Sequence, residues 1–216
     1  FFWTLGVSSS DPSISFEGLG TKWSIVISES LSDTATSDLL TSLLAMTRGF
    51  EELYSRFDPN SLVGKLNHTG QLKDFPSEFY DMLKYAIKCA DATDGYFNVA
   101  VGGRLEDIGY DSNYSLRAKE QLDDVPDIRK IDLGGFGKGW LIDKLAEHLL
   151  TKGVNKFVID GGGDVRVEGD ALKGESILLE NPHKSGQSIG EIKIRSGSVA
   201  CSSPKYRQWP KLGSDE

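Results

Sequence analysis

The segment IDLGGFGKGW at residues 131–140 carries four glycines in ten positions and holds the strongest structural signal in the chain. Residues 130–133 predict a short strand, residues 134–139 a glycine-rich turn, and the apolar spacing of residues 140–150 a helix. A chain that passes through glycines into a helix N-terminus directs free amides and the positive end of the helix dipole at one point. The spacing fits neither common nucleotide-binding glycine pattern, so an anion site and a tight strand-to-helix connection are equally supported.

Downstream of residue 150 the sequence predicts several strands. Residues 157–159 (FVI) are apolar, and Gly161-Gly162-Gly163 predicts a tight turn before Asp164. Such a turn serves either a plain hairpin or a loop that opens onto a ligand pocket, and both interpretations stay open. Further strands are expected around residues 164–168, 175–179, 190–195 and 198–202.

Upstream of residue 130 the sequence predicts one hairpin and two long helices. Residues 14–28 are rich in Ile, Val, Phe and Trp and predict a hairpin that bends at residues 18–20. Apolar residues at helical spacing predict helices over residues 35–56 and 77–93, each followed by a turn cluster. Because helices and strands gather in separate parts of the chain, the expected fold class is α+β.

Composition narrows the function classes. The chain has 216 residues, a formal net charge of -8 and a sequence pI of about 5.0. An acidic surface without a basic stripe repels the phosphodiester backbone, which argues against a nucleic-acid partner. A phosphate-containing cofactor stays compatible, because backbone amides or a metal ion can hold phosphate. The three histidines are widely separated and form no metal-binding or hydrolase motif.

Six segments, taken in order, resemble the motifs of the ApbE family of FAD:protein FMN transferases. GLGTKW (residues 18–23) is similar to an early Met-Gly-Thr motif, with Leu19 in place of Met. FDPNSLVGKLN (57–67) is similar to the segment that follows the family's first long helix. DGYFNVAVG (94–102) is similar to an internal glycine-bearing motif, and residues 131–140 with Asp143 to the most specific signature. The last two segments are residues 162–169 (GGDVRVEG), followed by Asn181-Pro182, and residues 199–207 (VACSSPKYR).

The resemblance runs over almost the whole chain and implies one domain over residues 1–216. The implied fold is an ApbE-like α/β core, related to the T-fold, with a smaller lobe and a flavin pocket between them. The implied reaction cleaves FAD and attaches FMN through a phosphoester to a Thr or Ser of a target flavoprotein, releasing AMP. Mg²⁺ would sit on the diphosphate, whose dense negative charge suits a metal ion and a cradle of amides.

The resemblance also assigns site residues, although it identifies no catalytic residue. Gly137 would give its backbone carbonyl to the metal ion. Asp132, Gly134 and Lys138 would lie beside the phosphates. The positions implied for contact with the flavin or its ribityl chain are Leu19, Gly20, Thr21, Phe57, Asn98, Val99 and Ala100.

Two departures from the family pattern affect these expectations. Asn98 and Ala100 stand where the family has aspartate and threonine, which removes a charge and a hydroxyl. The family pattern also continues past the position of Glu216, with a His-Ile-Asp-Pro motif and an Asp–Thr pair that completes the metal site. We therefore expect the C-terminal part of the family domain, with the other metal ligands, to lie beyond this chain.

Three functions remain open under this resemblance: an FMN transferase, a non-catalytic FAD-binding protein, and a Mg²⁺-dependent FAD pyrophosphatase. The loss of the aspartate and threonine favours the second. Family members are often exported and anchored by a lipid, so the resemblance implies a periplasmic or extracytoplasmic location. Membrane attachment would then come from a lipid anchor that this sequence does not contain.

Overall fold

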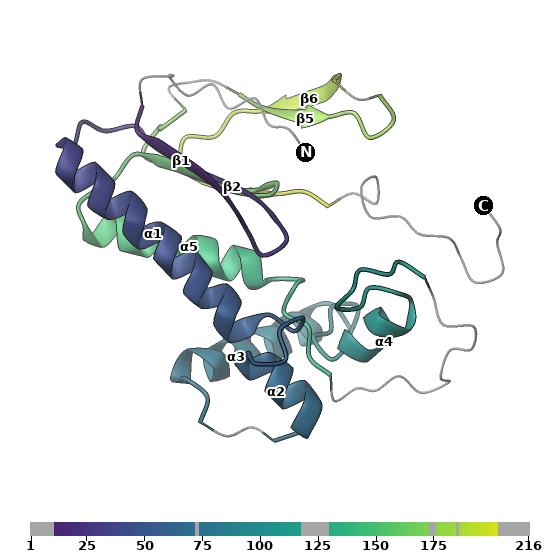
Figure 1. The fold of residues 1–216 in the computed structure, drawn as a ribbon. Helices are drawn as coiled ribbons and strands as arrows, with labels where there is room; N and C mark the ends of the chain where they lie inside the picture. The colour runs from purple at the N-terminus through teal and green to yellow at the C-terminus, as the bar shows by residue number, and fades with distance from the viewer. Residues whose placement is uncertain (1–10, 72–73, 118–129, 173–175, 185, 203–216) are drawn as a thin grey trace. The chain divides into compact units, whose positions relative to one another are not determined.

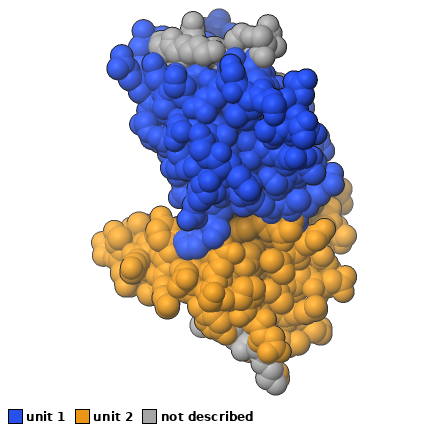
Figure 2. All heavy atoms as spheres, turned by 90° about the vertical axis from the view of Figure 1, so that its left-hand side faces the viewer, with its two compact units in different colours: residues 1–48, 138–206 blue, residues 49–137, 207–216 orange. Residues whose placement is uncertain are grey.

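The computed structural model describes residues 11–71, 74–117, 130–172, 176–184 and 186–202. The chain, drawn as a ribbon in Figure 1, forms two compact units, coloured in Figure 2: unit 1 is residues 1–48 and 138–206, and unit 2 is residues 49–137 and 207–216. Helices and antiparallel strands occur together, so the α+β class is confirmed. No helix in the described part of the chain has the length and apolarity needed to cross a membrane.

A five-stranded antiparallel sheet, ordered β1-β2-β3-β4-β7, is the centre of unit 1. A second sheet pairs β5 with β6. The strands are β1 Ser13–Gly18, β2 Thr21–Ile27, β3 Phe157–Gly161, β4 Asp164–Glu168, β5 Ile177–Glu180, β6 Ser188–Ile192 and β7 Gly197–Ala200. Every predicted strand downstream of residue 150 is thereby confirmed, with ends shifted by a few residues.

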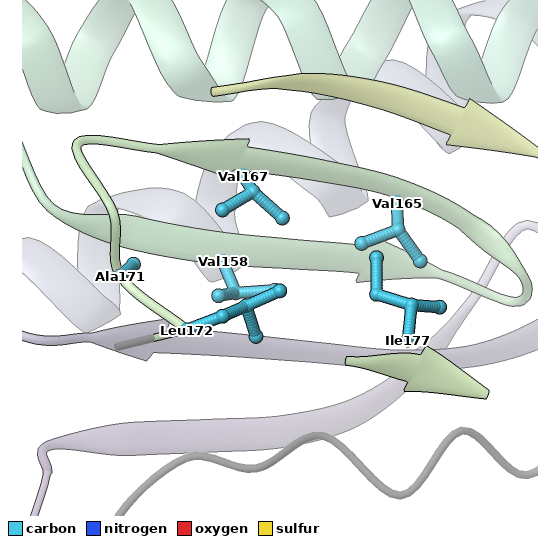
Figure 3. Packing of buried hydrophobic residues seen from close by; sticks show 6 residues of the cluster. All are labelled: Val158, Val165, Val167, Ala171, Leu172 and Ile177. Atoms are coloured by element: carbon cyan, nitrogen blue, oxygen red, sulfur yellow. The ribbon is translucent and has the colours of Figure 1, made fainter. Parts of the chain in front are cut away.

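The neighbouring strands β2 and β3 of the large sheet are buried on both faces, because they are apolar on each side. Ile25 pairs with Ile159 and Val26 with Val158, so adjacent pairs point to opposite faces. On one face lies α5, whose Ile142 would be 3.2 Å from a Cβ added at Gly161. The other face carries the cluster shown in Figure 3, which joins β3 and β4 to the segment that leads into β5. Its members are Val158, Val165, Val167, Ala171, Leu172 and Ile177.

The predicted hairpin bend at residues 18–20 is confirmed, and its geometry explains the sequence. Gly18 pairs with Thr21 across a two-residue turn. Both turn residues have positive φ, 50° at Leu19 and 69° at Gly20, which is the combination that matches the twist of two joined strands. The indole Nε1 of Trp23 donates to the carbonyl of Gly18 at 2.9 Å and fixes the bend from inside.

Unit 2 is mainly helical. The helices of the chain are α1 Asp33–Tyr54, α2 Leu62–Thr69, α3 Ser77–Ala92, α4 Gly102–Asp107 and α5 Gly137–Thr151. The helices predicted over residues 35–56 and 77–93 are confirmed as α1 and α3. Tyr54, at the end of α1, stacks on Phe79 of α3 with ring centroids 5.9 Å apart.

Three local predictions were wrong or incomplete. Residues 130–133 form no strand, because their backbone groups bond to a loop and to a side chain instead of to a neighbouring strand. The side chain is that of Asn67, whose Nδ2 donates to the carbonyl of Ile131 and whose Oδ1 accepts from the amide of the same residue. Helix α5 begins at Gly137, so the glycine-rich turn ends three residues earlier than expected. Helices α2 and α4 were not predicted. Short α2 is held by its caps: Ser61 accepts from the amide of Gly64 at 2.8 Å.

Candidate functional site

The predicted site residues are divided between the two units. Leu19, Gly20, Thr21 and Lys138 belong to unit 1, at the β1–β2 turn and the first turn of α5. The others belong to unit 2. They are Phe57, Asn98, Val99, Ala100, Asp132, Gly134 and Gly137.

In unit 2 the carboxylate of Asp132 shapes the glycine-rich turn. The residue is 9% exposed, and its Oδ1 accepts a 2.6 Å hydrogen bond from the amide of Gly134. The Leu133 carbonyl then accepts from the amides of Phe136 (3.1 Å) and Gly137 (2.7 Å), which begins α5. A Cβ at position 134 would lie 2.7 Å from Asp132 Oδ1, so this close approach requires glycine.

The other oxygen of Asp132 is held by Arg56, a residue that the sequence reasoning missed. Arg56 Nε donates to Asp132 Oδ2, and its Nη2 donates to the carbonyl of Tyr110 at 2.6 Å. The arginine side chain is only 4% exposed. Its guanidinium carbon lies 4.1 Å from the centroid of the Phe57 ring and 5.0 Å from that of Tyr110. Charge pairing and stacking together hold this group in one place.

Phe57, predicted to contact the flavin, lies in an aromatic cluster. Its centroid is 5.4 Å from that of Tyr110 and 5.1 Å from that of Tyr114. The ring therefore packs on the buried guanidinium and on two tyrosines. This packing places Phe57 next to the residue that holds Asp132.

The structure brings Asn98, Val99 and Ala100 beside Asp132. The amide of Asp132 donates to the carbonyl of Val99 at 2.8 Å. Asn98 Oδ1 accepts from the amide of Ala100 at 2.8 Å, an Asx turn that an aspartate at this position would also form. The change from the family's aspartate thus keeps the turn and removes its charge.

In unit 1, Lys138 lies at the end of the β3–β4 hairpin. Its Nζ is 2.8 Å from Asp164 Oδ2 and donates to the carbonyl of Gly161 at 3.3 Å. Thr21 is at the same end of the sheet, because a Cβ added at Gly162 would lie 2.1 Å from its Oγ1. With φ at +71°, position 162 also favours glycine conformationally. The tight turn predicted at residues 161–163 is therefore a hairpin turn.

Asp160 is a second acidic group at this hairpin that the sequence reasoning missed. Its Oδ1 accepts from the amide of Gly163 at 2.8 Å. Burial raises the pKa of the Asp160 carboxyl above its usual value, against the opposing effects of the turn amides and the Lys138 ammonium. At this end of unit 1 the positive charge of Lys138 therefore interacts with two carboxylates of the protein itself, those of Asp160 and Asp164.

Another polar pair in unit 1 joins α1 to α5. Ser42 Oγ lies 2.9 Å from His148 Nε2, beside a cavity of about 310 Å³. The hydroxyl of Ser42 donates its single proton to the carbonyl of Leu39 at 2.7 Å. When this bond forms, only a His148 tautomer protonated at Nε2 can bond Ser42 Oγ, and that tautomer cannot take up the serine proton.

The described residues alone do not fit a magnesium site. They contain no group of three His, Cys, Asp or Glu side chains that could hold a metal ion. Gly137 is the first residue of α5, and the carbonyl at such a position points along the helix toward the amide four residues later. A metal ion at Gly137 would share this oxygen with the helix and would need further ligands. The assignment of Gly137 stays a prediction.

Comparison with known proteins gives one consistent family. The family model described as "ApbE family" matches residues 19–215. An FAD:protein FMN transferase from Vibrio cholerae is 22% identical over 219 residues, covering 88% of this chain and 65% of the relative. The chain therefore spans just under two thirds of the length of that relative.

Solved structures agree with the fold. The ApbE protein from Thermotoga maritima superposes with a TM-score of 0.80 at 26% identity, covering 94% of this chain and 73% of that one. The flavin transferase ApbE from Vibrio cholerae gives a TM-score of 0.70 at 15% identity, covering 93% and 74%. The expected ApbE-like fold is confirmed by this likeness.

Proposed function

The chain belongs to the ApbE family, and we propose from this membership that it is an FAD:protein FMN transferase. The observation that carries the proposal is the ordered turn from Asp132 to Gly137, which lies where the family's most specific signature falls. This turn opens a helix and is fixed by a buried carboxylate, so its backbone is held in one orientation.

We propose that the substrate is FAD and the acceptor is a threonine or serine of a target flavoprotein. The acceptor oxygen forms a phosphoester with the FMN phosphorus, the phosphoanhydride bond breaks, and AMP leaves with that bond's electrons. The hydroxyl proton passes to solvent. Lys138 supports this proposal, because an ammonium beside the phosphates would offset the charge that develops on the leaving group.

We further propose that Mg²⁺ assists the reaction, on the strength of the family resemblance. Bound at the diphosphate, this ion would supply charge neutralisation. Gly137 would contribute its carbonyl, and no group of three His, Cys, Asp or Glu side chains among the described residues could complete the site. The check is metal removal: activity should disappear with a chelator and return with added Mg²⁺.

A second candidate, a non-catalytic FAD-binding protein, is favoured by Asn98 and Ala100. One experiment separates the candidates: the purified protein is incubated with FAD, Mg²⁺ and an acceptor domain, and the products are analysed by mass spectrometry. Covalent FMN on the acceptor supports the transferase. Intact bound FAD supports the binding protein, and free FMN with AMP supports a pyrophosphatase. The absence of all three would contradict each of these functions.

We propose an extracytoplasmic location, with membrane attachment through a lipid anchor, from the resemblance alone. The test is fractionation of cells that express the full-length gene product. Recovery in the periplasmic or membrane fraction is expected, and recovery only in the cytoplasm would contradict the proposal.

A further inference from the structure

We propose that Arg56 is a positioning residue for the turn at residues 132–136, and that it controls FAD affinity without touching FAD. This inference rests on the proposed function, because it concerns the turn assigned to the diphosphate. The contacts run in series: the guanidinium holds Asp132, and Asp132 holds the amide of Gly134.

The two oxygens of Asp132 have separate partners. Oδ2 accepts from Arg56 Nε, which leaves Oδ1 directed at the amide of Gly134 at 2.6 Å. A carboxylate as buried as this one is costly to leave without a charged or hydrogen-bonding partner. Without the guanidinium, the carboxylate would be free to turn toward water, and the amide of Gly134 would lose its fixed acceptor.

Arg56 acts from inside unit 2. Its side chain is 4% exposed, and its planar group stacks on Phe57 while its Nη2 donates to the Tyr110 carbonyl at 2.6 Å. Glu106 Oε1 is 4.0 Å from Nη1 and pairs more closely with Lys130. An enclosed group with these contacts is held too firmly to reach a ligand, so its influence passes through Asp132.

The geometry specifies arginine rather than any cation. The guanidinium donates from Nε to the Asp132 carboxylate and from Nη2 to the Tyr110 carbonyl, while its planar face stacks on the ring of Phe57. Lysine would keep the positive charge but has one nitrogen and no planar face. The lysine variant therefore separates the effect of charge from the effect of position.

The test compares Arg56→Lys with Lys130→Met, which breaks the neighbouring and more exposed ion pair to Glu106 without touching Asp132. FAD affinity is measured by calorimetry, with KM and kcat for transfer and the thermal midpoint of each variant. Arg56→Lys should raise both Kd and KM for FAD about tenfold, while kcat at saturating FAD changes little. Lys130→Met should leave all three near wild type.

A second variant covers the case in which Arg56→Lys does not fold. Asp132→Asn has the same shape and keeps an oxygen for Gly134, but it breaks the ion pair. Removing a negative charge beside a diphosphate would by itself tighten FAD binding, whereas loss of positioning weakens it. A lower Kd in Asp132→Asn, or an unchanged Kd in folded Arg56→Lys, would overturn the inference.

The failures of the two proposals can be told apart. If the wild-type protein does not bind FAD, the proposed function fails and the role of Arg56 in FAD binding fails with it. If the wild-type protein binds FAD and the folded Arg56→Lys variant binds it equally well, only the positioning role is lost. A double variant adds one more check: Arg56→Lys should cost much less affinity in an Asp132→Asn background, and additive losses would contradict action through Asp132.

Discussion

The ammonium of Lys138 lies 2.8 Å from the carboxylate of Asp164 at the end of the β3–β4 hairpin. Both side chains are about a quarter exposed, 27% and 22%, so a ligand can reach the pair. A diphosphate would therefore compete with Asp164 for the lysine. Until such an anion binds, the Asp164 carboxylate neutralises the Lys138 ammonium.

This relationship predicts opposite effects for its two members. Lys138→Met should weaken FAD binding about tenfold, because a charge-assisted contact to phosphate is lost. Asp164→Asn should bind FAD at least as tightly as wild type, because the competing carboxylate is removed. Lys152→Met, an exposed lysine just past the other end of α5, is the control. Calorimetric titration measures all three, and equal weakening in the two test variants would contradict the prediction.

Two glycines of the same segment should respond oppositely to alanine. A Cβ at Gly134 would meet Asp132 Oδ1 at 2.7 Å, whereas a Cβ at Gly139 meets nothing within 4 Å. Gly134→Ala should lower the free energy of unfolding by about 1–3 kcal/mol. Gly139→Ala, inside α5, should raise it by up to about 1 kcal/mol. Denaturant unfolding checks both, and a neutral Gly134→Ala would refute the packing argument.

Tyr54→Phe should not destabilise the protein near neutral pH. The Tyr54 hydroxyl is buried and has no hydrogen-bond partner among the described residues. Removing an unpaired buried hydroxyl should raise the free energy of unfolding by about 1 kcal/mol. A loss of stability of similar size, measured by urea unfolding, would show that the hydroxyl has a partner.

The same substitution predicts an effect at high pH. Burial, with a smaller contribution from Glu78, raises the pKa of Tyr54 from 10.0 to about 12. Between these values the folded state keeps a proton that the unfolded state releases, so stability falls as the pH rises from 10 to 12. In the Tyr54→Phe variant this contribution to the fall in stability between pH 10 and 12 should be absent. Identical profiles for wild type and variant would contradict the pKa shift.

Asp160→Asn predicts a second pH dependence. Because burial raises the pKa of the Asp160 carboxyl, the folded state binds its proton more readily than the unfolded state. The stability gained from this proton is fully present below pH 3.8, the unfolded value, and is lost as the pH rises through the folded value. Asp160→Asn should therefore be more stable than wild type at pH 7, and this advantage should shrink toward pH 3. A pH-independent difference in thermal midpoint would contradict it.

Much of the fold could be predicted from local patterns in the sequence. The hairpin at β1–β2, helices α1 and α3 and the strands after residue 150 each follow from periodicity and turn residues close in sequence. The pattern failed at residues 130–133, where Asn67 and the loop at residue 99 take the backbone bonds that a strand would need. Helix α2 had usable signals, Ser61 at its start and Gly70 at its end.

The site shows the limit of such reasoning more sharply. Asp132 was predicted from its motif, but its partner Arg56 is 76 residues away and carries no local signal. Asp160 sits in an apolar strand beside three glycines, and only the folded hairpin shows its neighbour Lys138. Residues that become neighbours only in the folded chain cannot be identified from local patterns in the sequence.

Titration of the protein with FAD and with riboflavin, in the presence of Mg²⁺, tests the central claim most directly. If the turn at residues 132–136 recognises a diphosphate, FAD should bind and riboflavin, which has no phosphate, should bind at least about a hundredfold more weakly. Absence of FAD binding, or equal affinity for the two flavins, would contradict the account.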